Sequence, residues 1–178
     1  APILDIASDG EDIYVLSQRS DKILIVTPWG AHETPSLGGI IIAITAAELM
    51  VGRIFALRED AAIIEVESST QAIKIIHKAS RMGSVQTHCR HFAVVEGMEA
   101  LAWLTCSESI EVVDISDGVS WRSTTLDLPR KSQFGGVFAV TAGRSENEVI
   151  IFIVERQMTI RRYRANVLDN TISKLGCL

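Results

Sequence analysis

The feature that most constrains the fold of this chain is an internal repeat. An apolar segment that contains a small residue occurs four times along the 178 residues, at positions 4–7, 42–45, 92–95 and 138–141. Self-similarity at a spacing of roughly forty-five residues is typical of proteins that stack several copies of one supersecondary unit. We therefore expect each copy to bury its apolar surface against its neighbours.

Each copy continues with three further short segments. The second is strongly apolar, contains an aromatic residue, and lies at 13–16, 54–57, 101–104 and 150–153. The third lies at 23–26, 63–66, 110–113 and 158–161, and the more polar fourth lies at 31–37, 71–76, 119–126 and 170–175. These runs are short, rich in Val and Ile, and bounded by Gly, Ser, Asp or Asn, which indicates strands.

A helix is the main alternative at 45–59, where Ala, Glu, Leu and Met favour helical structure. Gly52 interrupts this stretch, and its place in the repeat predicts strand, turn, strand instead. The sequence thus predicts an all-β fold of four repeated four-stranded antiparallel sheets. Small residues such as Ala43 and Ala139 suit a crowded innermost strand, and Lys74 and Lys174 suit an exposed outer one.

With these strands the chain resembles a run of four β-propeller blades of generic WD40-like or quinoprotein-like type. The resemblance covers nearly the whole chain as a single repeat domain, with approximate blades at 2–40, 41–85, 86–135 and 136–178. The Gly-His and Trp-Asp pairs of WD40 blades are absent, and Val113-Asp114 is the nearest match to the second pair.

Four blades form a small propeller or part of a larger one, as a fragment or as half of a dimeric or heteromeric ring. Unclosed blades would expose two apolar faces. The resemblance therefore implies partners: other protein chains that complete the propeller in a homo- or hetero-oligomer.

Composition and charge favour an intracellular, cytoplasmic protein. Three cysteines without a pattern and the lack of an Asn-x-Ser/Thr sequon favour a reducing compartment. The chain begins at Ala1 without a signal-peptide pattern, and its longest uncharged apolar run, 38–47, is too short for a membrane helix. A net charge of −5 disfavours a dedicated nucleic-acid binder.

The histidine cluster around Cys89 does not have the pattern of a metal site. On an extended strand Cys89 and His91 would share one face while His88 would point the other way, and His77 lies well upstream. We interpret these residues as structural or solvated, and we predict neither a metal nor a cofactor.

Catalytic signatures are also missing. There is no Gly-x-Ser-x-Gly elbow, phosphate-binding loop or His-Glu-x-x-His motif, and Cys106 follows an apolar strand as buried thiols do. The pairs Asp9-Gly10 and Asp117-Gly118 are turn formers before they are acid–base groups. The sequence therefore favours a protein without a catalytic site.

Two features suggest contacts with partners. Trp29 lies in an exposed loop and is a candidate anchor, since tryptophan is common at interface hot spots. The other feature is a basic stripe made of Arg156, Arg161, Arg162, Tyr163 and Arg164. Period-two alternation would place Arg162 and Arg164 on one face and Arg161 and Tyr163 on the other.

These observations favour a protein–protein interaction scaffold, part of a β-propeller within a larger assembly. One alternative is a ligand-binding or hydrolytic propeller enzyme, whose site at the channel mouth would draw polar residues from each blade. Another is an RNA-associated structural subunit that uses the basic stripe.

Overall fold

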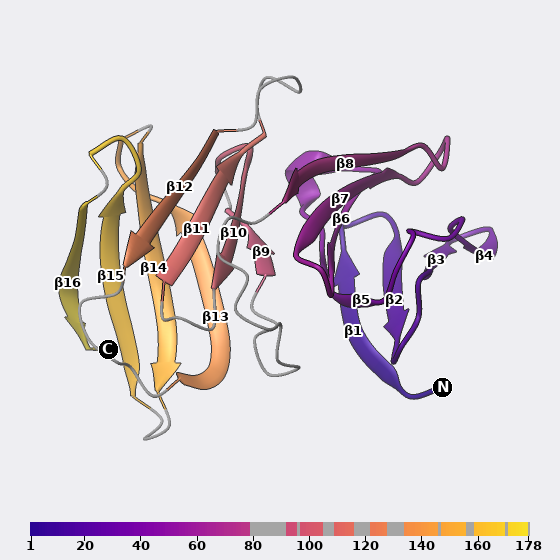
Figure 1. The fold of residues 1–178 in the computed structure, drawn as a ribbon, viewed down its shortest axis with the longest axis horizontal. Helices are drawn as coiled ribbons and strands as arrows, with labels where there is room; N and C mark the ends of the chain where they lie inside the picture. Colours follow the sequence, from indigo (N-terminus) through magenta and orange to yellow (C-terminus); the bar gives the residue numbers. More distant parts are fainter. Residues whose placement is uncertain are drawn as a thin grey trace. The chain divides into compact units, whose positions relative to one another are not determined.

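The part of the chain that the structure describes consists mainly of β-strands, arranged in four separate sheets (Figure 1). The computed structural model describes residues 1–78, 92–95, 97–104, 109–115, 122–127, 134–145, 147–155, 159–169 and 171–177. Each sheet is formed by four consecutive strands, and each strand pairs antiparallel with the next one.

The sheets follow the order of the sequence. Sheet 1 contains β1 (Ile3–Ser8), β2 (Ile13–Ser17), β3 (Ile23–Thr27) and β4 (Gly30–Glu33). Sheet 2 contains β5 (Ile41–Thr45), β6 (Arg53–Arg58), β7 (Ala62–Glu67) and β8 (Ile73–Lys78), with the short 3-10 helix η1 (Glu48–Met50) before β6. Sheet 3 contains β9 (Phe92–Val94), β10 (Ala100–Leu104), β11 (Ser109–Asp114) and β12 (Arg122–Asp127). Sheet 4 contains β13 (Phe134–Ala142), β14 (Glu148–Glu155), β15 (Ile160–Asn166) and β16 (Thr171–Cys177).

This arrangement confirms the predicted all-β fold of four blade-like, four-stranded antiparallel sheets. At 45–59 the chain forms only the one-turn helix η1 and then β6, so the prediction of strand, turn, strand is also confirmed. The third strand of the last repeat was placed too early: it was expected at 158–161, and β15 begins at Ile160 and ends at Asn166. Arginines at three of its positions hide the apolar alternation on which the prediction depended.

The chain divides into two compact units. The first is Ala1–Arg90 and contains sheets 1 and 2, and the second is His91–Leu178 and contains sheets 3 and 4. The strands of sheets 1 to 3 lie within the first three predicted blade intervals. In sheet 4, β13 begins at Phe134, two residues before the predicted start of the fourth interval at 136. The single repeat domain stays a prediction. Among the described residues, no helix has the length and apolar character needed to cross a membrane.

Each unit has its own apolar core between its two sheets. In the first unit, sheet 1 contributes Tyr14, Leu16, Ile23 and Ile25, and sheet 2 contributes Ile41, Ile44, Ile54, Ala56, Ile64 and Val66. In the second unit, Val95, Ala100, Ala102, Ile110 and Val112 pack against Val140, Val149, Ile151, Ile153, Tyr163 and Ala165. Burying one large aliphatic side chain stabilises the fold by roughly 1.5–3 kcal/mol, so these cores dominate the packing of each unit.

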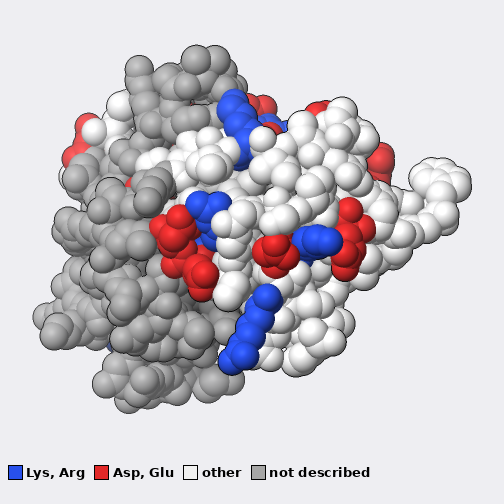
Figure 2. All heavy atoms as spheres, turned by 45° about the vertical axis from the view of Figure 1, so that its right-hand side comes forward, with Lys and Arg blue, Asp and Glu red and all other residues white. Residues whose placement is uncertain are grey.

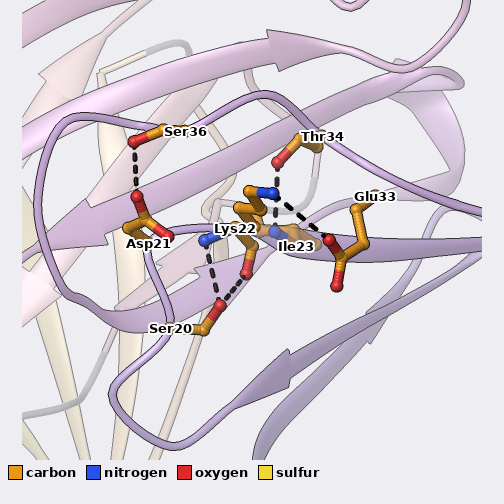
Figure 3. A network of polar contacts seen from close by, with 7 residues as sticks. All are labelled: Ser20, Asp21, Lys22, Ile23, Glu33, Thr34 and Ser36. Atoms are coloured by element: carbon orange, nitrogen blue, oxygen red, sulfur yellow. Dashed lines mark hydrogen bonds and ion pairs between the residues drawn. The ribbon is translucent and has the colours of Figure 1, made fainter.

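Polar contacts fix the connection from sheet 1 to sheet 2 (Figure 3). The Thr34 hydroxyl accepts a hydrogen bond from the backbone N–H of Ile23 at 3.1 Å, and the Ser36 hydroxyl donates one to the Asp21 carboxylate. The backbone N–H of Leu37 donates to the carbonyl of Asp21 at 2.8 Å. These bonds hold the chain against the turn between β2 and β3 before it enters β5.

Candidate interaction site

One face of sheet 1 is apolar and exposed. Cross-strand pairing places Ile6, Val15 and Leu24 in one row, and Ile13 and Val26 in a second row beside it. The exposed fraction is 58% for Ile6, 48% for Ile13 and 36% for Leu24. We call these five residues the open face of sheet 1, because the opposite face carries the core residues Tyr14, Leu16, Ile23 and Ile25.

The same row is buried in each of the other three sheets. The equivalent residues follow from the register between the first strand of each sheet and the two strands after it. They are Ile44, Ala56 and Ile64 in sheet 2, Val94, Leu101 and Val113 in sheet 3, and Val140, Ile151 and Tyr163 in sheet 4. All nine are buried. In sheets 2 and 4 this row packs into the core shared with the preceding sheet. The open face of sheet 1 therefore has the residue pattern of a packed face.

A charged side chain lies at the outer edge of this face, because Glu33 on β4 continues the row of Ile6, Val15 and Leu24. Lys22 and Glu33 form an ion pair at 3.4 Å near the outer strand, where Glu33 pairs with Leu24 across the sheet. Figure 2 turns the right-hand side of Figure 1 forward and shows, on the described surface, basic side chains beside acidic ones with uncharged areas between them. The five residues of the open face are uncharged, and a charge lies at its outer edge on β4.

Trp29 extends from the turn between β3 and β4. Its exposed fraction is 91%, which confirms the predicted exposure. The backbone N–H of Trp29 donates to the Thr27 hydroxyl at 3.2 Å, and that hydroxyl donates to the carbonyl of Gly30, also at 3.2 Å. The turn is thereby fixed with the indole in solvent, and the role of Trp29 as an anchor stays a prediction.

The basic stripe is divided between two faces of β15, as the alternation predicted. Tyr163 is only 3% exposed and belongs to the core, so its ring is not accessible for stacking on a base. Arg162 and Arg164 lie on the opposite face, across from Phe152 and Ile150 on β14. Arg161 pairs with Ile153, and Arg156 lies outside the described residues.

A hollow of about 440 Å³ lies over this face of sheet 4, and we call it the arginine hollow. Its lining includes Arg144, Glu148, Phe152, Arg162, Arg164 and Leu175. The sequence predicted the shared face of Arg162 and Arg164 but not the hollow. Arg144 and Leu175 come from other segments, and only the pairing of β13 to β16 brings them together.

Asp9 shows a structural role that the sequence did not reveal. Its side chain is 1% exposed and accepts hydrogen bonds from the backbone N–H groups of Glu11 at 3.0 Å and Asp12 at 2.9 Å, as the predicted turn requires. It also accepts one from the Tyr14 hydroxyl at 2.5 Å and one from the backbone N–H of Gly52 at 2.7 Å. Asp9 therefore links the turn of sheet 1 to the loop before β6.

These contacts change the protonation equilibria of Asp9 and Tyr14. Burial alone would raise the pKa of the Asp9 carboxyl, but the hydrogen bonds that it accepts more than offset this and lower its pKa. Burial and the adjacent Asp9 carboxylate raise the pKa of the Tyr14 hydroxyl. Asp9 is thus a fully engaged carboxylate, which suits a structural role better than that of a general base.

A second hollow, of about 580 Å³, lies beside this network where turns of sheets 1 and 2 meet. Its lining includes Glu11, Asp12, Thr27, His32, Ser68 and Gln71. Within the described ranges, no group of three or more His, Cys, Asp and Glu is placed to hold a metal ion. The predicted cluster of His88, Cys89 and His91 lies outside those ranges, as does Cys106. A ligand-binding or hydrolytic role stays a prediction.

Comparison with known proteins identifies a shared fold but no family. No protein-family model matches the sequence, and no curated protein matches it. Among solved structures, one similar chain is a structural-genomics protein of unknown function from Bacteroides thetaiotaomicron, with a TM-score of 0.61 and 13% identity. The match covers 96% of this chain and 46% of that one, so this chain spans less than half of that protein. At this identity the likeness shows the fold alone.

Proposed function

We propose that this chain is an interaction module, a run of propeller-type blades that forms part of a larger assembly. The open face of sheet 1 binds the apolar face of a further blade, supplied by another protein chain. The observation that carries this proposal is the row of Ile6, Val15 and Leu24. In this row Ile6 and Leu24 are exposed and Val15 is half-buried, although the equivalent row is buried in every other sheet.

The energetics support a docking role for this face. Exposed apolar residues that are scattered singly are ordinary, whereas a contiguous apolar sheet face is typical of an interaction surface. Covering Ile6, Ile13 and Leu24 would remove from water side chains that each contribute roughly 1.5–3 kcal/mol when fully buried. The comparison is also consistent with this role, since more than half of the similar solved chain lies outside the match.

The test is the mass of the purified chain in solution, by light scattering after size exclusion. Without another blade present, we expect open faces to cover one another, so that the mass is at least twice 19.5 kDa. The double variant Ile6→Thr/Leu24→Thr keeps residues that favour strands but removes apolar area from the face. We expect this variant to have the mass of the monomer.

A matched control is Leu49→Thr/Leu168→Thr. Both leucines are more exposed than Ile6 and lie in η1 and in the turn before β16, away from the open face. This variant should associate as the natural chain does. A monomeric natural chain at every concentration, or equal association of both double variants, would show that the open face is not a docking surface.

A further inference from the structure

Arg162 departs from the repeat at a position that is otherwise apolar and buried. Pairing to the innermost strand identifies its equivalents as Ile23, Ile63 and Val112. All three are buried, at 2% exposure or less. Natural sequences break their own structural pattern mainly at functional or strained sites, so this arginine calls for a reason beyond packing.

Among the residues that the structure describes, none is a hydrogen-bond or ion-pair partner that would explain the position of the Arg162 guanidinium. Its Nε atom is buried and makes no hydrogen bond, and no ion pair involves Arg162 in the part of the chain that the structure describes. Buried polar groups in proteins are almost always hydrogen-bonded, and an arginine offers five N–H donors in a planar fork. The arginine hollow thus contains a donor group that lacks an acceptor.

The charged residues around Arg162 carry an excess of positive charge, which also favours a bound acceptor. Among the described residues, the arginine hollow is lined by three arginines, Arg144, Arg162 and Arg164, and by one carboxylate, that of Glu148. Glu148 already pairs with Arg164 at 3.4 Å and accepts a hydrogen bond from the backbone N–H of Arg144 at 3.3 Å. The hollow therefore carries local positive charge on a chain whose net charge is −5, which favours an anion there.

Apart from Thr141 and Gly143, the other described residues of the lining are apolar. Ile150 and Phe152 lie across from the two arginines of β15, and Leu175 contributes from β16. A volume of about 440 Å³ is in the range of small-molecule sites, in which a few polar groups orient a largely apolar ligand.

We propose that the arginine hollow binds a small organic anion. A phosphate or carboxylate group of the ligand accepts hydrogen bonds from Arg162 and Arg164, since the guanidinium fork matches both groups. The apolar part of the ligand contacts Phe152 and Leu175. This proposal does not depend on the open face of sheet 1. If the apolar face of another blade covered the arginine hollow, the Arg162 guanidinium would be buried without an acceptor.

The experiment uses the full chain with phenyl phosphate and phenylacetate as probes, and follows the arginine Nε–H signals by ¹H–¹⁵N NMR. We expect either or both probes to shift the Arg162 signal saturably, and the affinities of the two distinguish a phosphate site from a carboxylate site. Inorganic phosphate and neutral benzyl alcohol, which each carry only one half of the proposed ligand, should bind at least tenfold more weakly than the better probe.

Three variants test the role of Arg162. Arg162→Gln should weaken the binding of the better probe at least tenfold. Arg162→Lys should weaken it less, because lysine keeps the positive charge but lacks the planar fork of donors. Arg19→Gln, at an exposed turn position in sheet 1, is the matched control and should bind as the natural chain does. Amide spectra that match those of the natural chain show that each variant is folded.

Several outcomes would overturn the proposal. One is no saturable shift of Arg162 with either aromatic anion, and another is binding that Arg162→Gln leaves unchanged. A third is binding of inorganic phosphate as tight as that of the aromatic anions. This result would show that the apolar part of the ligand contributes nothing to its affinity. If neither aromatic anion binds but a single-stranded RNA does, in a salt-dependent way that Arg162→Gln weakens, the face serves nucleic acid instead.

Discussion

At Asp9, one buried carboxylate contributes to the pH dependence of the stability of the first unit. Its pKa in the folded chain lies below the unfolded value of about 3.9. Its stabilising contribution is therefore complete above that value, and is lost as pH falls through the folded-state pKa. We expect Asp9→Asn to lower the free energy of unfolding by about 1–3 kcal/mol at pH 7, since it weakens hydrogen bonds to a buried charged acceptor.

Chemical denaturation at pH 7 and at pH 3 measures this contribution. The difference between the natural chain and Asp9→Asn should shrink at the lower pH, while Asp169→Asn, in the exposed turn after β15, should differ little at either pH. An equal difference at both pH values would mean that the Asp9 carboxylate contributes no charge-dependent stability.

The sequence predicted half of what Asp9 does. Asp9-Gly10 is a turn signal in one stretch of chain, and the bonds to Glu11 and Asp12 are those of that turn. The bond to Gly52 connects residues 43 positions apart, and nothing in a local pattern indicates it. The same holds for Arg162. The alternation along the strand predicted the face on which it lies, but the absence of a hydrogen-bond partner for its Nε depends on the tertiary structure.

Among the elements, strands were predictable wherever apolar residues on the core side alternate with other residues. Comparison of the four copies of the repeat outweighed local propensity. The residues around Gly52 favour a helix, but their place in the repeat predicted the strand, turn and strand that the structure forms at β5 and β6. The signal failed at β15, where only Tyr163 and Ala165 bury apolar groups and arginines occupy the alternate positions. A strand with one polar face and a short apolar one has a weak periodicity.

Arg58, at the end of β6, links the segment before β5 to the turn after β6. Its Nε and Nη2 donate to the Asp60 carboxylate at 2.7 and 2.8 Å, and its Nη1 donates to the carbonyl of Leu37 at 3.1 Å. Lysine cannot make these contacts together. Because Asp60 is partly exposed, we expect Arg58→Lys to cost only about 1 kcal/mol in urea denaturation. Arg19→Lys is the control, and an equal cost for both variants would show that the fork geometry at Arg58 contributes nothing.

At the scale of the whole molecule, the core described in each unit predicts a region of local stability in that unit. Leu16 belongs to the core of the first unit, and Leu→Ala substitutions in cores cost about 2–5 kcal/mol. In Leu16→Ala we expect faster amide hydrogen exchange in β2, β3, β6 and β7, measured by mass spectrometry on the full chain, with β14 and β15 little changed. Ile151→Ala, in the other core, should give the reverse pattern. Equal acceleration throughout in either variant would mean that all four sheets unfold as one cooperative unit, because exchange then reports global opening.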